Sequence, residues 1–187
     1  MVNGSWVTDL AVYIRIPFMG PTTHHKLLPN SPMPTKTEIT FLQDDEKLFS
    51  SIAEMFYNEW QVDRSLTVDW LKKRTGRKLP FVLVAHRDAK PIGIAALDNE
   101  VKILSNYPES KQYTPLVSLL YVLPEYRNMG IASLLCNKIE AEAFRTGISR
   151  VFLYARNTDT LYKKLGWKEM ERVLYKAQET VVMYKDM

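Results

Sequence analysis

The chain has 187 residues, of which 46% are hydrophobic and 25% are charged, as is typical of a soluble globular domain rather than a disordered chain. Its net charge is +4 and it contains no run of five basic residues, so a nucleic-acid-binding surface is not indicated. No apolar stretch approaches the ~20 residues that span a bilayer, and charged residues interrupt the N-terminal segment, which argues against a signal peptide.

The chain contains a single cysteine, Cys136, which limits the disulfides and metal sites that it can form. One cysteine forms neither an intrachain disulfide nor a cysteine-based metal cluster. A single cysteine fits a reducing cytoplasm, and we expect a cytoplasmic protein without a metal. We also expect no nucleic-acid or membrane partner, and a monomer or a homodimer.

The first 36 residues differ from the rest, because they hold five of the ten prolines. Apolar residues alternate here with the period of a strand, at Leu10, Val12, Ile14, Ile16 and Phe18. Two interpretations stay open: an irregular proline-rich leader, or an extra edge strand docked on the domain or on a partner chain. We place the regular domain at residues 37–187.

Regular elements are expected from residue 37 onward. In chain order they are a strand at 37–42, a helix capped by Asp44 or Asp45, a helix at 65–75, a hairpin of strands at 81–86 and 92–97, a polar loop at 99–115, a buried strand at 116–122, a helix at 130–145, a strand at 150–155, a short helix at 159–165, and strands near 167–175 and 180–184. This order predicts an α/β fold with one mixed sheet.

The helix at 130–145 has a predicted core face. Its apolar residues recur at helical spacing and should point inward: Ile131, Leu134, Leu135, Ile139 and Ala143. Gly147 is expected to end the helix.

The segment that joins the buried strand to this helix indicates an anion site. It reads Arg127-Asn128-Met129-Gly130-Ile131-Ala132. A strand that runs through a tight loop into a helix points several backbone N–H groups, and the positive end of the helix dipole, in one direction. Gly130 lets the backbone approach a phosphate, Asn128 tolerates a left-handed conformation, and Arg127 adds a cation.

Two motifs carry a resemblance to a known family. Arg127-x-x-Gly130-x-Ala132 resembles the pyrophosphate-binding signature Q/R-x-x-G-x-G/A of the GNAT acetyltransferases. Downstream, Leu161-Tyr162-Lys163-Lys164-Leu165-Gly166-Trp167 is similar to the family's second signature, with Trp167 in place of the usual phenylalanine. The resemblance implies the GNAT acyl-CoA N-acyltransferase fold, a central, mixed, mostly antiparallel twisted sheet flanked by helices, with acetyl-CoA as co-substrate.

The resemblance also implies where the donor binds. The pantetheine arm would pair with the backbone of Leu120, Tyr121 and Val122, where the fourth and fifth strands splay apart. A backbone N–H near Val122 would stabilise the tetrahedral oxyanion. The pyrophosphate would lie on the loop residues Arg127, Asn128, Met129, Gly130, Ile131 and Ala132. Asn157 matches a polar residue that contacts pantetheine, although it would equally suit the cap of the next helix.

Candidate acid and base groups follow from the same resemblance. Tyr162 matches the family's general acid, which protonates the departing CoA thiolate. The attacking amine must first lose a proton, and Asp98 and Glu100, which follow the third strand, are the candidate bases, acting directly or through water. Ser118 interrupts the buried strand and would bind a ligand, relay a proton or bond to the backbone.

The predicted function is transfer of the acetyl group of acetyl-CoA to a primary amine, on a small molecule, peptide or protein, by direct attack in a ternary complex. The acceptor would lie near Trp60, Trp70 and the loop 99–115, although a core role suits both tryptophans. The alternative is a degenerate GNAT module that binds CoA or a partner and catalyses no transfer.

Overall fold

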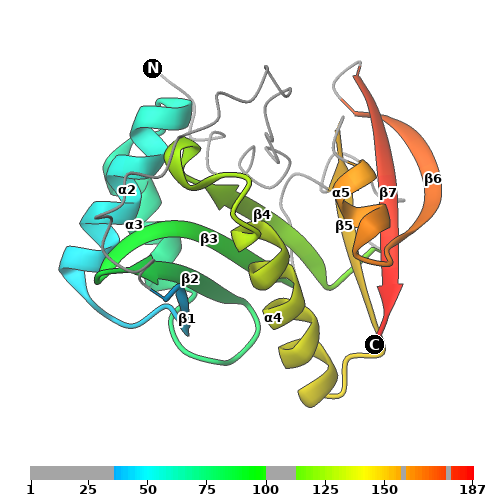
Figure 1. The fold of residues 1–187 in the computed structure, drawn as a ribbon, viewed down its shortest axis with the longest axis horizontal. Helices are drawn as coiled ribbons and strands as arrows, with labels where there is room; N and C mark the ends of the chain where they lie inside the picture. Colours follow the sequence, from blue (N-terminus) through cyan, green and yellow to red (C-terminus); the bar gives the residue numbers. More distant parts are fainter. Residues whose placement is uncertain (1–35, 100–112, 157–158, 176–177) are drawn as a thin grey trace, which may run out of the picture.

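The computed structural model describes residues 36–99, 113–156, 159–175 and 178–187. Within this part of the chain, seven strands form one sheet in the order β1-β2-β3-β4-β5-β7-β6 (Figure 1). Every neighbouring pair is antiparallel except β4 and β5, which confirms the predicted mixed sheet. The strands are β1 (Glu38–Phe41), β2 (Phe81–Arg87), β3 (Lys90–Asp98), β4 (Leu116–Val122), β5 (Arg150–Ala155), β6 (Lys168–Tyr175) and β7 (Gln178–Asp186).

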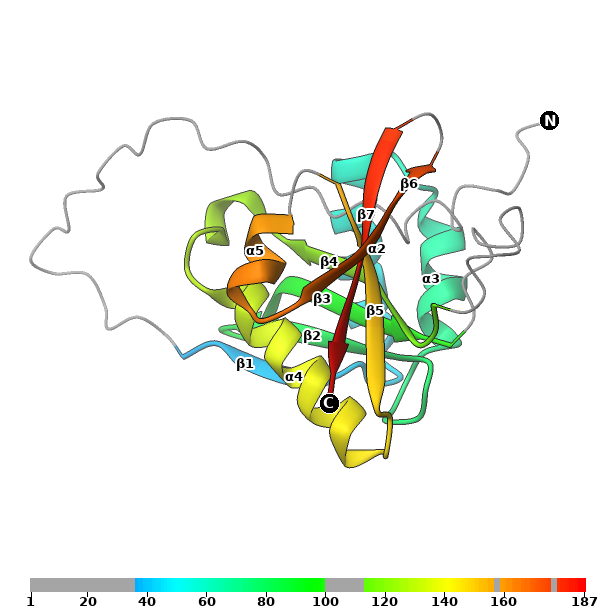
Figure 2. The same ribbon diagram turned by 90° about the vertical axis from the view of Figure 1, so that its right-hand side faces the viewer.

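Helices cover both faces of the sheet. They are α2 (Glu46–Trp60), α3 (Arg64–Lys72), α4 (Ile131–Arg145) and α5 (Asp159–Lys164), with one 3-10 turn, η4 (Pro124–Tyr126). Figure 2 shows α4 and α5 on one side of the sheet and α2 and α3 on the other. The side chains of β4 divide between the two layers, because Leu119 and Tyr121 belong to the core under α2 and α3, whereas Leu120 and Val122 belong to the core under α4.

An aspartate caps the N-terminus of each helix on this side of the sheet, α2 and α3. Asp45 caps α2 by accepting from the backbone N–H groups of Lys47 and Leu48, which confirms one of the two predicted caps. Asp63 caps α3 in the same way. Because a cap satisfies N–H groups that no helical carbonyl can reach, it fixes where the helix begins.

Helix α4 departs from the prediction at one position. Ile131, Leu135, Ile139 and Ala143 are buried as expected, but Leu134 is 47% exposed. Cys136, expected as a small core residue of this helix, is buried, so the buried face is turned slightly away from Leu134. Gly147 follows the last turn in a left-handed conformation, with φ of 79°, as a helix-ending glycine should.

The hairpin is tighter than predicted. Only Asp88 and Ala89 separate β2 from β3, and both have positive φ, 52° and 61°. A two-residue turn with two left-handed residues matches the right-handed twist of the strands that it joins. The predicted strand at 10–18 and most of the leader lie outside the described residues.

Candidate functional site

Strand β4 is paired with β5 only at its beginning. The pairing comprises Leu116 with Phe152 and Val117 with Leu153. Between β3 and β4 the register shifts at this point, because Ala96 faces Leu119 whereas Leu97 faces Val117. Ser118 is therefore the extra residue of a β-bulge, and beyond it β4 and β5 diverge (Figure 1).

Beyond the bulge, none of the described strands pairs with β4 on the side away from β3, so the predicted pantetheine residues lie on a free strand edge in this part of the chain. Leu123 donates its N–H to the carbonyl of Ile92 on β3, at 2.9 Å. Since backbone groups alternate along an antiparallel strand, the N–H groups of Leu120 and Val122 point away from β3 and toward the gap before β5. An edge of this kind offers backbone donors to an added extended chain.

The loop after β4 ends at the N-terminus of α4 without a side-chain cap. Gly130 occupies the cap position with φ of 76°, and no side chain of the described residues caps the first N–H groups of α4. Asn128 is left-handed as predicted, with φ of 62°. A side-chain carbon added at Gly130 would meet no atom within 4 Å, so the glycine is required by its backbone conformation rather than by packing. The uncapped N–H groups and the dipole of α4 favour an anion here.

Arg127 does not extend freely from this loop. Its Nε donates to the carbonyl oxygen of Val122 at 2.9 Å, and its Nη2 lies 3.8 Å from an oxygen of Glu59 on α2. Glu59 in turn accepts a hydrogen bond from the Tyr121 hydroxyl at 3.1 Å. Burial, reinforced by Glu59, raises the pKa of Tyr121 to about 12. Arg127 thus ties the loop to β4 and α2, and its charge is partly neutralised within the protein.

Tyr162 lies in the core between α5 and α4. Its side chain is fully buried, and its hydroxyl has no hydrogen-bond partner among the described residues. Its ring meets that of Trp167 edge-on at 6.0 Å. Burial raises the pKa of Tyr162 well above 10, and the nearby Cys136 adds to this. The phenol therefore keeps its proton at neutral pH, as a general acid requires.

Trp167 occupies the position of the motif's usual phenylalanine, and its indole nitrogen is satisfied. It donates to Glu140 on α4 at 2.9 Å. The other oxygen of Glu140 accepts from Lys185 on β7, and Lys185 also reaches the carbonyl of Leu165, both at 2.6 Å. This network holds the end of α5, and with it Tyr162, against α4 and β7.

Asp98 is buried rather than open to solvent. It is 2% exposed, and one of its oxygens accepts from Nε of Arg74 at 2.8 Å. The other oxygen accepts a short hydrogen bond from the hydroxyl of Ser118, the bulged residue. The Arg74 guanidinium also stacks on Trp70, 4.3 Å from the ring centroid. Asp98 and Ser118 are thus brought together, whereas the other candidate base, Glu100, and Asn157 lie outside the described residues.

Glu59 is the site residue that sequence reasoning missed. It follows the buried Ile52 and Phe56 at helical spacing, so a carboxylate stands on the inward stripe of α2. Its side chain is 18% exposed at an open groove of about 680 Å³ between α2 and η4. The lining residues are Ser50, Ser51, Glu54, Met55, Asn58, Glu59, Lys90, Tyr121, Leu123, Pro124 and Glu125.

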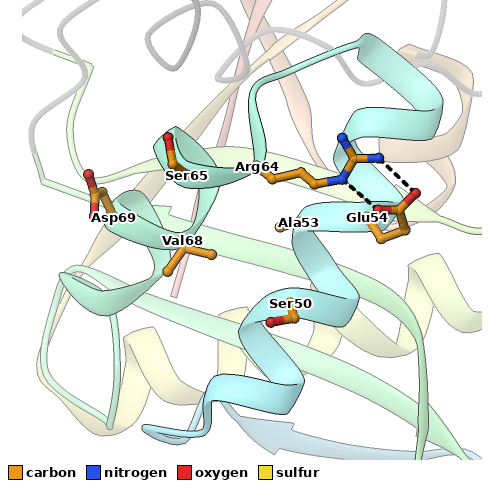
Figure 3. Close-up of a pocket in the computed structure, with 7 residues that line it drawn as sticks. All are labelled: Ser50, Ala53, Glu54, Arg64, Ser65, Val68 and Asp69. Carbon is orange, nitrogen blue, oxygen red and sulfur yellow. Dashed lines mark hydrogen bonds and ion pairs between the residues drawn. The ribbon is translucent and has the colours of Figure 1, made fainter.

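A smaller hollow of about 350 Å³ lies on the other side of α2, against α3. Figure 3 shows its Arg64 and Glu54 joined by an ion pair, at 2.6 Å, across the space between the two helices. Both side chains are about half exposed, so this pair contributes little to stability. The hollow contains no residue of β4 or of the loop 127–132.

Several remaining candidate residues belong to the core. Trp60 and Trp70 pack on the core under α2, each against Phe56. Cys136 is buried, and burial raises the pKa of its thiol to about 12, which makes it a poor nucleophile. Within the described residues, no cluster of histidine, cysteine and acidic side chains is arranged to hold a metal ion. Nor does that part of the chain contain a helix long and apolar enough to cross a membrane.

The sequence is similar to known proteins. Residues 46–167 match the Acetyltransferase (GNAT) family. An aminoglycoside N(6')-acetyltransferase type 1 of Acinetobacter genomosp. 13 is 36% identical over 99 residues, which cover 50% of this chain and 66% of that protein. The chain thus spans about two thirds of the length of this curated relative.

Solved structures agree on the fold. An aminoglycoside 6'-N-acetyltransferase in complex with coenzyme A superposes with a TM-score of 0.65 at 13% identity, over 80% of this chain and 96% of that one. An N-acetyltransferase of Staphylococcus aureus Mu50 gives a TM-score of 0.64 at 18% identity, over 81% and 99%. With the family match covering well over half of the sequence, this chain belongs to the GNAT family of acetyltransferases.

Proposed function

We propose that this protein is an acetyl-CoA-dependent N-acetyltransferase that transfers the acetyl group to a primary amine by direct attack in a ternary complex. The observation that carries the proposal is the open edge of β4. It begins at the Ser118 bulge, runs past Leu120 and Val122, and ends at the uncapped N-terminus of α4.

The residues present fit the donor. The N–H groups of Leu120 and Val122 face the gap and would pair with the amide groups of pantetheine. The pyrophosphate would lie on the N–H groups of the segment from Asn128 to Ala132, where Gly130 and the α4 dipole favour negative charge. Asn157, which lies outside the described residues, would contact the pantetheine.

Tyr162 is the proposed general acid. The thiolate of CoA leaves as the tetrahedral intermediate collapses, and the proton of the phenol passes to its sulfur. A hydroxyl that is buried and unsatisfied within the described residues suits this role, because it retains both its proton and its capacity to donate. A backbone N–H of the β4 edge, at or near Val122, would carry the oxyanion.

The proton of the amine needs an acceptor. Asp98 is enclosed and paired with Arg74, so an acceptor molecule would reach it through the Ser118 hydroxyl or through water rather than directly. Glu100 is the alternative carboxylate. The two are distinguished by Glu100→Gln, which lowers kcat only if Glu100 is the base.

Thiol release from acetyl-CoA, measured with a panel of monoamines, polyamines, aminoglycosides and peptides, tests the proposal. We expect acetyl-CoA to raise Tm and at least one amine to be acetylated. If acetyl-CoA stabilises the fold and no amine in the panel supports turnover, the protein is a CoA-binding module. If acetyl-CoA leaves Tm unchanged, the donor site itself is refuted.

A further inference from the structure

The donor loop lies beside two arginines whose surroundings differ. Arg127 belongs to the loop and has a carboxylate, Glu59, within 3.8 Å and a hydrogen bond to the Val122 carbonyl, although its Nη2, like Nε of Arg87, is buried without a hydrogen-bond partner among the described residues. Arg87, at the end of β2, approaches the same loop from the hairpin. Its guanidinium carbon lies 5.5 Å from the centroid of the Tyr126 ring, and its Nη1 lies 3.6 Å from the sulfur of Met129.

Arg87 has no carboxylate partner. Among the described residues no acidic oxygen lies within ion-pair distance of its guanidinium, and its Nε is buried without a hydrogen-bond partner. Its one hydrogen bond to an oxygen joins Nη2 to the Thr37 hydroxyl at 3.2 Å. Its Nη1 donates to the sulfur of Met129, which is a weak acceptor, so the guanidinium keeps donor capacity for an anion beside the loop.

The charge of the neighbouring Lys90, unlike that of Arg87, has an acidic partner. Its Nζ lies 5.9 Å from the Tyr126 ring centroid, so Arg87 and Lys90 both stand over this aromatic residue. Glu125 is 3.9 Å from Lys90 and offsets its charge. Arg87 is therefore the cation at this loop that the protein itself leaves uncompensated within the described residues.

We propose that Arg87 binds a phosphate group of the donor and that the β2–β3 hairpin is part of the CoA site. This inference rests on the proposed function. CoA carries a pyrophosphate and a ribose 3′-phosphate, and a guanidinium binds either through charge-assisted hydrogen bonds. Met129 is 53% exposed beside Arg87 and immediately precedes the Gly130 cap, so a phosphate on the α4 N-terminus lies next to this arginine.

Isothermal titration of the full chain with three donors tests the proposal. They are acetyl-CoA, 3′-dephospho-acetyl-CoA and acetyl-pantetheine, which lacks both kinds of phosphate. We expect Arg87→Gln to raise the Kd of acetyl-CoA about tenfold and to leave acetyl-pantetheine unchanged. If the 3′-phosphate is the ligand, the variant binds dephospho-acetyl-CoA as wild type does. If the pyrophosphate is the ligand, that donor weakens as well.

Arg77→Gln is the matched control. Arg77 precedes the other end of β2 and stacks on an aromatic ring, Phe41, at 4.8 Å, so this variant removes the same charge from a similar setting. Arg87→Lys, which keeps the charge, should retain more affinity than Arg87→Gln.

The inference is overturned if Arg87→Gln and Arg77→Gln bind acetyl-CoA equally, or if Arg87→Gln weakens acetyl-pantetheine to the same extent. If wild type binds no acetyl-CoA, the proposed function fails first. These outcomes are therefore separable.

Discussion

The two ends of strand β4 have different polar surroundings. Buried, paired side chains lie near its start, and unpaired backbone N–H groups of the described residues lie near its end. At the start, the bulged Ser118 and Asp98 are buried, and Arg74 neutralises the carboxylate. At the end, Gly130 begins α4, and among the described residues no side chain forms a cap hydrogen bond there. The contrast indicates that polar groups are satisfied internally where β4 is paired on both sides, whereas backbone N–H groups stay without a described partner where β4 and β5 diverge.

The largest effect is expected when the buried carboxylate near the start of β4 is neutralised. Asp98→Asn leaves the Arg74 guanidinium, whose side chain is 14% exposed, without a counter-charge. Breaking a buried ion pair in this way costs about 3 kcal/mol of unfolding free energy, measurable by urea denaturation. Asp186→Asn is the control, because its pair with Arg150 is about half exposed and should contribute little to stability. Equal losses in the two variants would contradict an enclosed structural role.

A second substitution adds a negative charge at the N-terminus of α4. Gly130→Asp places a carboxylate beside the proposed pyrophosphate position and should raise the Kd of acetyl-CoA about 100-fold, by like-charge repulsion. Gly130→Asn is the matched control, because asparagine has nearly the same shape, tolerates positive φ and carries no charge. The anion site is wrong if the two variants bind acetyl-CoA alike in titration calorimetry.

Tyr162→Phe separates catalysis from stability. We expect kcat to fall about tenfold to 100-fold, as for loss of a general acid, with little change in the Kd of acetyl-CoA. The unfolding free energy should stay the same or rise by about 1 kcal/mol, since the lost hydroxyl is buried without a partner in the described structure. Unchanged kcat would remove Tyr162 from the mechanism, and a large loss of stability would show that its hydroxyl is bonded.

The smallest effect concerns alkaline pH. Burial raises the pKa of Tyr121 to about 12, whereas the unfolded chain ionises the phenol near its ordinary value of ~10. The resulting stability is complete below pH ~10 and is lost as pH rises toward 12. Tyr121→Phe should therefore flatten the decline of Tm between pH 9 and 11. A decline as steep as that of wild type would contradict the raised pKa.

The sequence predicts most of the elements because their signals are local. Strand β4 was predicted with its observed bounds, since its apolar run ends at Pro124, and α4 begins one residue later than expected, after Gly130. Leu134 was placed on the wrong face because helical periodicity alone does not show how a helix is rotated on its sheet.

Contacts between residues that lie far apart in the chain could not be predicted from local sequence patterns. Asp98 was predicted as an accessible base, but its partner Arg74 lies 24 residues away, and nothing local to either residue indicates the pair. Arg127 was predicted as a cation for phosphate, and only the fold shows Glu59 of α2 beside it. The Ser118 bulge likewise depends on registers with two other strands.

Hydrogen–deuterium exchange of the full chain, with and without acetyl-CoA, tests the donor site most directly. We expect acetyl-CoA to slow exchange in peptides covering Leu120, Val122 and the first turn of α4, where N–H groups face the gap or lack a cap. Peptides of β1 should exchange as before. If acetyl-CoA binds without protecting the β4 edge, the donor does not lie along this strand.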